Sequence, residues 1–156
     1  MKPYLRILNE HEKKQIREKL NEQFGVIEIP GILLKRGEDK IFLFQGEFDR
    51  KQLLELENNV PVERTGIYFA KEQNGEVRLS IEGVYILREQ LTKSIFQLDE
   101  KQAEEWMLGQ ELPIATGRHN FLIMKHKDYF LGCGKASENK IGNFIPKNRR
   151  LKYKEN

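Results

Sequence analysis

A single cysteine is the first residue in this sequence that could do covalent chemistry. Cys133 lies near His119 and His126, and an imidazole can activate a thiol as a nucleophile. Its neighbours, however, have the composition of a buried strand, and a free cysteine is usually a small core side chain. We therefore expect no catalytic residue at this position.

The second group with chemical potential is a set of cations near the C-terminus. Residues 118–156 carry ten Lys and Arg against three Asp and Glu, a net charge of +7. Residues 1–117 carry 17 against 21, a net of −4, so the chain as a whole is only +3. A basic quarter on a mildly acidic body is expected where one face meets a polyanion. A solvated basic tail explains the same count, and the charge alone leaves both interpretations open.

Length and composition exclude several classes of protein. A chain of 156 residues, 38% hydrophobic and 33% charged, forms one ordinary domain or two small ones. It has no apolar run of the ~18 residues that cross a bilayer, and it begins without the apolar stretch of a secretory signal. One cysteine gives no internal disulfide, and the usual zinc-ligand spacings are missing. We expect a cytoplasmic protein with no cofactor, no metal site and no membrane partner.

The elements that must position the cations follow from the hydrophobic pattern. Asn9 and Glu12 form a capping-box pair, and a helix on which Ile16, Leu20 and Phe24 share one face should follow and end at Gly25. Short strands are expected at 26–29, 32–35 and 41–44, and a short helix between 49 and 60. A β-hairpin is expected at 67–71 and 77–81, around a turn at 74–75.

The second half of the chain has a different pattern. A strand at 93–97 should precede a helix that begins at Asp99, carries Ala103, Trp106 and Met107 on one face, and ends at Gly109. Strands are then expected at 121–125, 129–134 and 140–144, which is typical of a small barrel or sandwich. The break between the halves, between residues 80 and 92, is not rich in Gly or Ser. The halves should therefore pack together.

Three stretches of this second half resemble a known family. They read LDEKQAEEWMLGQEL at 98–112, LGCGK at 131–135 and NFIPKNRRL at 143–151. Together they resemble a PUA domain, the RNA-binding module named after pseudouridine synthases and archaeosine transglycosylases. The likeness is to the PUA-like C-terminal region of Sun-family RNA cytosine-5 methyltransferases and to small archaeal ribosome-biogenesis proteins of that type. It extends over residues 80–153.

The expected fold class is α+β. A small N-terminal α/β domain at residues 1–79 should pack against a C-terminal PUA-like β pseudo-barrel at residues 80–156. The resemblance implies about five or six strands with one or two helices. It also implies that RNA is gripped by the first helix, the glycine-containing loop after it, which is 112–120 here, and the adjoining strand edges.

RNA binding needs cations at phosphate spacing and donors that reach base edges or 2′-hydroxyls. The candidate residues are Arg118, His119, Lys135, Lys147, Asn148, Arg149 and Arg150. An ordinary surface turn, a packing role for the nearby glycines and a solvated terminus are the competing explanations. Among the aromatic residues, Tyr129 and Tyr153 are candidates for stacking on bases, whereas Trp106, Phe121, Phe130 and Phe144 are expected in the core.

We expect a non-catalytic protein that binds structured RNA, either rRNA or tRNA. It would act in ribosome biogenesis or as an accessory factor to an RNA-modification enzyme, because the family's methyltransferase core does not fit in this length. One alternative is an adaptor whose N-terminal domain docks on an RNA methyltransferase or on pre-ribosomal proteins. Another is a small enzyme on a PUA-like fold, which would need a pocket joining Arg118, His119 and an acidic residue.

Overall fold

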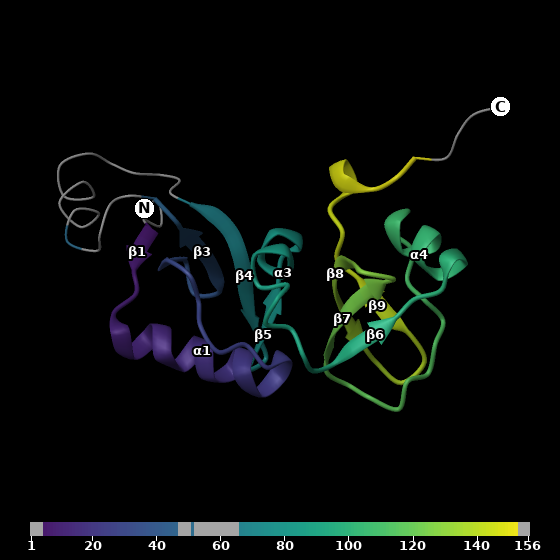
Figure 1. Cartoon of the computed structure of the whole chain (residues 1–156), viewed down its shortest axis with the longest axis horizontal. Helices are drawn as coiled ribbons and strands as arrows, with labels where there is room; N and C mark the ends of the chain where they lie inside the picture. Colours follow the sequence, from purple (N-terminus) through teal and green to yellow (C-terminus); the bar gives the residue numbers. More distant parts are fainter. Residues whose placement is uncertain (1–4, 47–50, 52–65, 153–156) are drawn as a thin grey trace.

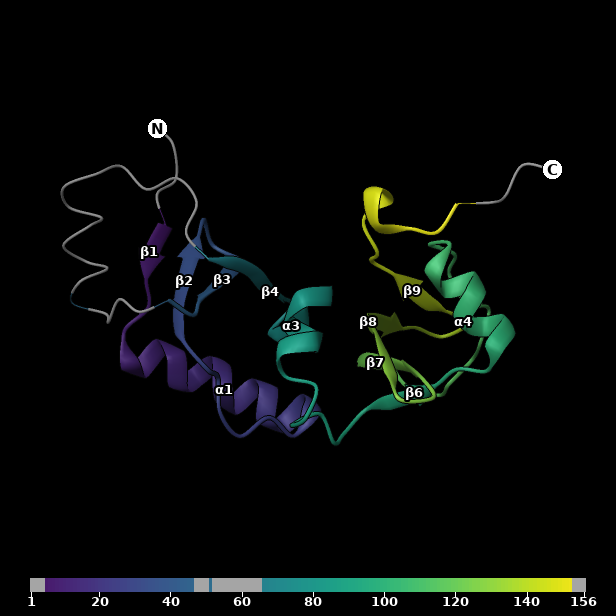
Figure 2. The ribbon, with the colours of Figure 1, turned by 45° about the horizontal axis from the view of Figure 1, so that its top comes forward.

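The first sheet is antiparallel and carries one long helix on one of its faces. The computed structural model describes residues 5–46, 51 and 66–152. The sheet has the order β1-β2-β3-β4-β5, and α1 lies across it (Figures 1 and 2). Its elements are β1 (Leu5–Ile7), α1 (Glu10–Phe24), β2 (Ile32–Arg36), β3 (Lys40–Phe44), β4 (Ile67–Gln73) and β5 (Glu76–Leu79).

Helix α1 begins and ends where its capping residues predict. The Asn9 side chain accepts a hydrogen bond from the Glu12 backbone N–H at 2.8 Å, and the Glu12 carboxylate accepts one from the Asn9 N–H at 3.1 Å. Gly25 closes the helix in the left-handed region, with φ 86°. Ile16, Leu20 and Phe24 are buried against the sheet, as the spacing predicts.

The second sheet is mixed and smaller. Its order is β6-β7-β8-β9, with β6 parallel to β7 and the other pairs antiparallel. Helix α4 lies on its outer side, and α3 lies between the two sheets (Figure 1). The elements are α3 (Ile81–Ile86), β6 (Ile95–Gln97), α4 (Glu100–Met107), β7 (Phe121–His126), β8 (Tyr129–Ala136), β9 (Ile141–Asn143) and a 3₁₀ helix, η1 (Lys147–Arg149).

The mixed α+β class is confirmed. An isolated bridge between Leu112 and Ile141 adds to the four strands, and the described residues form no closed barrel. The strand count is therefore lower than the resemblance implies. Within the described ranges, no helix combines the length and the apolar composition needed to cross a bilayer.

Three local expectations differ from the structure or lie outside it. Residues 26–29 are not a strand, because the Gln90 side chain accepts from the N–H groups of Ile27 and Glu28 and donates to the Glu28 carbonyl. The second hairpin strand, expected to reach residue 81, ends at Leu79. Ser80 instead caps helix α3, whose six residues with Gly83 inside give little helical signal. The helix expected between 49 and 60 lies outside the described residues.

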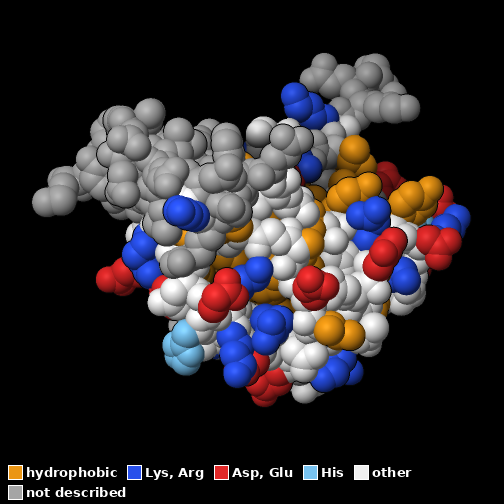
Figure 3. All heavy atoms as spheres, turned by 60° about the vertical axis from the view of Figure 1, so that its left-hand side comes forward, with side chains coloured by type: hydrophobic (Ala, Val, Ile, Leu, Met, Phe, Trp, Pro, Cys, Tyr) orange, Lys and Arg blue, Asp and Glu red, His pale blue; other side chains and the backbone are white. Residues whose placement is uncertain are grey.

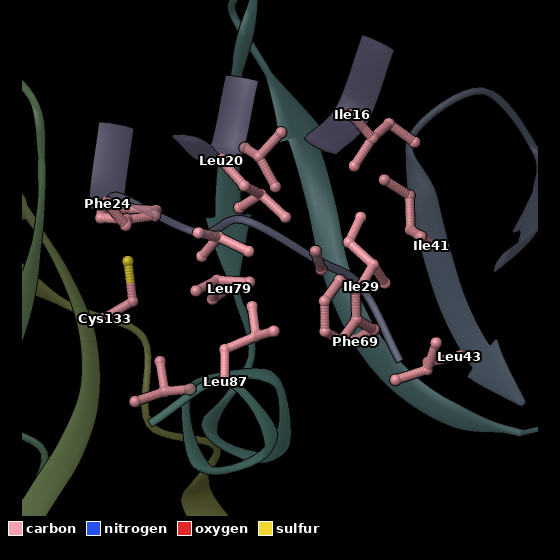
Figure 4. Packing of buried hydrophobic residues seen from close by; sticks show 14 of the residues in the cluster. Ile16, Leu20, Phe24, Ile29, Ile41, Leu43, Phe69, Leu79, Leu87 and Cys133 are labelled. Carbon is pink, nitrogen blue, oxygen red and sulfur yellow. The ribbon is translucent and has the colours of Figure 1, made fainter. Parts of the chain in front are cut away.

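One hydrophobic core joins the two sheets. The same cluster holds residues from α1, from α3 and its C-cap, and from β7 and β8, including Phe24, Leu87, Phe121 and Cys133. In Figure 4, Cys133 projects from β8 toward Phe24, with Leu79 and Leu87 close by. The backbone N–H groups of Thr92 and Lys93 both donate to the Phe24 carbonyl, at 2.9 and 3.2 Å. The halves are therefore packed together, as the composition of the connecting segment predicts.

A second core lies between α4 and the second sheet. Trp106 is fully buried there and donates its indole N–H to the Leu131 carbonyl at 2.8 Å. Gly134 of β8 lies next to an edge of the indole ring. A Cβ at this position would come within 2.8 Å of both the Trp106 ring and the Ile141 side chain. The glycine in this motif thus solves a packing problem.

We expect Cys133 to be unreactive in the folded protein. Burial raises the pKa of its thiol to about 12 from an ordinary value of 9.0, so almost no thiolate forms at pH 8. Labelling with iodoacetamide at pH 8 should be negligible without denaturant and complete in urea. Because the folded pKa is the higher one, Cys133 should also lower the free energy of unfolding as the pH rises from 9 toward 12. The Cys133→Ala variant should lack this contribution, and rapid native labelling would contradict the packing described.

Gly134→Ala should destabilise the protein by roughly 1–3 kcal/mol, because the added methyl group has no room beside Trp106. Gly142→Ala in β9 is the matched control. The nearest atom to a Cβ there is 3.7 Å away, so we expect a change within about 0.5 kcal/mol. Urea denaturation of both variants measures the difference, and equal stabilities would refute this account of the glycine.

Candidate nucleic-acid interface

The loop from α4 to β7 presents two of the candidate residues. Leu112 and Ile141 exchange backbone hydrogen bonds of 3.1 and 2.8 Å, which fix the start of the loop. Gly117 then adopts φ 77°, and Arg118 and His119 follow it as exposed residues. Within the described ranges, the Arg118 guanidinium has no hydrogen bond or ion pair, so it is available to an anion.

Lys135 lies beside this loop, but its charge is engaged within the protein. Its ammonium donates to the His119 carbonyl, forms an ion pair with Glu76 at 3.3 Å and lies 4.7 Å from the centre of the Phe121 ring. Glu76 belongs to β5, so this ion pair connects the second sheet to the first. The sequence marked Lys135 only as a candidate for RNA binding, and it did not indicate this contact between the two sheets.

The 3₁₀ helix η1 carries most of the remaining candidates. Lys147 and Asn148 are exposed, and no described residue forms an ion pair with Lys147. Arg149 is also exposed but pairs with Glu82 of α3. Of the three side chains, Lys147 and Asn148 are thus the freer to meet a ligand.

Arg150 has a different environment from its neighbours. Its Nε donates to the Ile145 carbonyl at 2.9 Å, and its side chain packs over Gly109, where even a Cβ would collide with it. This position is just beyond the C-terminus of α4, where a cation is favoured by the helix dipole. Arg150 therefore holds the end of η1 against α4, whereas Lys147 is exposed.

Asn143 fixes the segment that leads into η1. Its amide donates to the carbonyls of Trp106 and Gln110 at 2.9 and 3.0 Å, and its oxygen accepts from the Ile145 N–H at 2.8 Å. The first two bonds tie the end of β9 to the end of α4, and the third fixes the turn that follows β9. Asn143 is a positioning residue that the sequence analysis did not single out.

The candidate RNA-binding residues form two separate groups, one around the 112–120 loop and one on η1. Phe121 is paired with Lys135 near the end of β8, so the Arg118 loop lies at that end. Strand β9 runs antiparallel to β8 and carries the chain away from Lys135 toward η1. Figure 1 accordingly shows η1 and the 112–120 loop at opposite ends of the second sheet.

The described surface on the side of α1 shows no patch of a single charge. Figure 3 shows Lys and Arg side chains interspersed with Asp and Glu on that side of the molecule. Helix α1 itself carries four Lys and Arg and four Glu. Anions are therefore not favoured over cations there.

Four cations of the first sheet escaped the sequence analysis. Arg36, Lys40, Lys71 and Arg78 line a groove together with Asn148 and Arg149. They were overlooked because the first 117 residues are acidic in total. Alternation along the chain could not have found them, because the strands at 32–36 and 67–73 each bury two consecutive residues.

The aromatic side chains divide largely as expected. Phe121 and Trp106 are buried, Phe130 and Phe144 are half-buried, and Tyr129 is 69% exposed. Tyr153 lies outside the described residues.

The described residues show no constellation for covalent chemistry. Cys133 is 5% exposed, and neither histidine forms a hydrogen bond with its thiol among the contacts of the described chain. The Nδ1 atom of His126 instead lies 2.9 Å from the Leu98 carbonyl oxygen. No three His, Cys, Asp or Glu side chains of the described ranges lie close enough together to hold a metal ion.

Comparison with known proteins points to the same segment. Residues 93–151 match the family described as the methyltransferase RsmF PUA domain. The chain is also similar to the ribosomal RNA small subunit methyltransferase F of Aeromonas salmonicida (strain A449), at 26% identity over 137 residues. The aligned part is 87% of this chain and 27% of that relative, so the chain spans about a quarter of the relative's length. The matched residues contain β6 to β9, α4 and η1, and the match confirms the resemblance to a PUA domain that the three motifs carry.

Proposed function

We propose that this chain binds small-subunit ribosomal RNA and serves a reaction that methylates it. The observation that carries the proposal is the PUA domain, whose exposed Arg118, Lys147 and Asn148 have no carboxylate partner among the described residues. Cations that are unpaired within the protein gain most from phosphate contacts, because no ion pair must be broken first. The name of the related methyltransferase supports rRNA as the target.

In this proposal the chain binds and positions RNA and does no chemistry itself. The match to the methyltransferase family lies in its PUA domain, and Cys133 is buried with a raised pKa. A methyl-transferring core would then act on the RNA that this chain holds. The chain's role would be that of an accessory factor in rRNA modification and ribosome biogenesis.

In this proposal the seven candidate residues have different roles. Arg118, His119, Lys147 and Asn148 would contact RNA directly. Lys135, Arg149 and Arg150 would mainly shape the interface, because each already has a partner within the protein. Arg149 could exchange Glu82 for a phosphate, whereas Arg150 would have to leave its packed position on α4.

We expect tight and salt-dependent binding of small-subunit rRNA transcripts. Lys147→Glu and Arg118→Glu should each weaken it, and each should make the slope of log K against log salt shallower by about 0.7 to 0.9 per lost phosphate contact. Lys14→Glu, an exposed change on α1 outside the PUA domain with the same charge difference, is the matched control. Fluorescence anisotropy with labelled rRNA and tRNA fragments measures both quantities.

Affinity that is the same at 50 and 200 mM salt would refute the RNA-binding proposal, as would equal binding by the three variants. A chain that instead retained a protein partner and bound no RNA would be the adaptor. Comparing rRNA with tRNA fragments in the same titration tests the choice of target.

A further inference from the structure

A groove of about 740 Å³ lies between the first sheet and the 3₁₀ helix η1. Strands β3 and β4 form its floor, and the segment that contains η1 forms one wall. Among the described residues, the lining combines cations with aromatic and apolar side chains, and the Glu82 carboxylate in it is paired with Arg149.

Four cations of the groove form a single row across the sheet. Arg36 is the register partner of Lys40, Lys40 of Lys71, and Lys71 of Arg78, so each of β2 to β5 contributes one. Adjacent strands are ~4.8 Å apart, which gives the row a length of about 14 Å.

This row is an unfavourable arrangement for an isolated sheet. Like charges directly opposite each other on neighbouring strands destabilise the pairing. Within the described ranges, Lys71 has a carboxylate partner, Asp39 at 3.6 Å, whereas Arg78 lies over the Phe144 ring at 4.2 Å. A bound polyanion would offset the repulsion along the whole row.

A β-bulge places an aromatic pair beside the cations. Tyr68 and Lys71 are three residues apart on β4 and would face opposite sides of a regular strand. The register shifts next to Phe42, and both Phe69 and Ala70 turn into the core with no exposed surface. Tyr68 and Lys71 therefore both face the groove. Tyr68 lies against Phe42 with 5.7 Å between ring centres.

The wall opposite this floor belongs to the PUA domain. Asn148 and Arg149 line the groove from η1, and the Arg149–Glu82 ion pair holds that helix to α3. The groove is thus continuous with the candidate RNA interface. A strand of RNA that contacts η1 is able to extend directly across the sheet.

We propose that this groove binds a single-stranded segment of the RNA held by the PUA domain. The backbone phosphates lie along the row of four cations, and a base contacts the Phe42–Tyr68 pair. Single-stranded RNA is favoured over a duplex because unpaired bases offer free faces to aromatic side chains. This inference rests on the proposed function and adds to it the kind of RNA and a second contact surface.

The test uses a fluorescein-labelled 12-nucleotide oligouridylate and the full chain. Lys40→Gln combined with Lys71→Gln should make the slope of log K against log salt shallower by about 1.4, at about 0.7 per phosphate contact in single strands. The matched control is Lys14→Gln with Arg17→Gln, on α1. Tyr68→Leu should lower the affinity at least about fivefold, whereas Tyr68→Phe should retain it.

The unfolding temperature of each variant shows whether weaker binding comes from a lost RNA contact or from a destabilised fold. The double Lys40 and Lys71 variant should unfold at or above the wild-type temperature, since it relieves the repulsion along the row. Tyr68→Phe and Tyr68→Leu both lack the hydroxyl, so a difference in binding between them reports on the ring.

The outcomes distinguish this inference from the proposed function. Oligouridylate binding that responds to the groove variants no more than to the α1 control overturns the inference, even if rRNA fragments still bind and respond to Lys147→Glu. Failure of the wild-type chain to bind either RNA overturns both.

Discussion

The apolar seam between the two sheets is the contact on which the candidate interface depends. Side chains from α1, α3, β7 and β8 share one core there, and Phe24, Leu87 and Phe121 are each at most 1% exposed. Burial of a Leu or Phe side chain contributes about 1.5–3 kcal/mol, so a few such residues outweigh any surface ion pair in the protein. The seam therefore fixes the position of the first sheet relative to η1. Without it, the cations of β2 to β5 would not face the PUA domain.

Ion pairs beside this seam help to fix how the two sheets are oriented relative to each other. Lys135 reaches from β8 to Glu76, and Arg149 reaches from η1 to Glu82. Exposed ion pairs of this kind contribute little free energy, but their geometry selects one arrangement among those that the apolar contacts allow. Lys135, which the charge pattern marked as a ligand, thus also connects the two halves, and Arg149 connects η1 to the helix between the two sheets. The expected boundary between residues 79 and 80 falls immediately before α3, the helix that both sheets share.

Elements with strong local signals could be predicted from the sequence. The capping boxes at Asn9 and Asp99 and the Asn74-Gly75 turn are short-range patterns, and each begins or joins the element it predicts. Residues 26–29 show where such reasoning ends. Their β-type composition is real, but Gln90, more than 60 positions away, takes their hydrogen bonds. No local pattern contains that information.

The candidate RNA-binding residues could likewise be predicted only in part from local sequence. The sequence identified which residues are basic, and it could not show which of them are already engaged. Arg150 and Lys147 are three positions apart in one basic stretch, yet one is packed on the end of α4 and the other is exposed. The cations of the first sheet could not be recognised from the net charge. The net charge of residues 1–117 adds together side chains that lie on different faces of the protein, so a basic face is hidden by acidic residues elsewhere. Register is the missing quantity, since pairing of four strands turns Arg36, Lys40, Lys71 and Arg78 into one row. A surface that binds a polyanion is therefore defined by strand pairing as much as by composition.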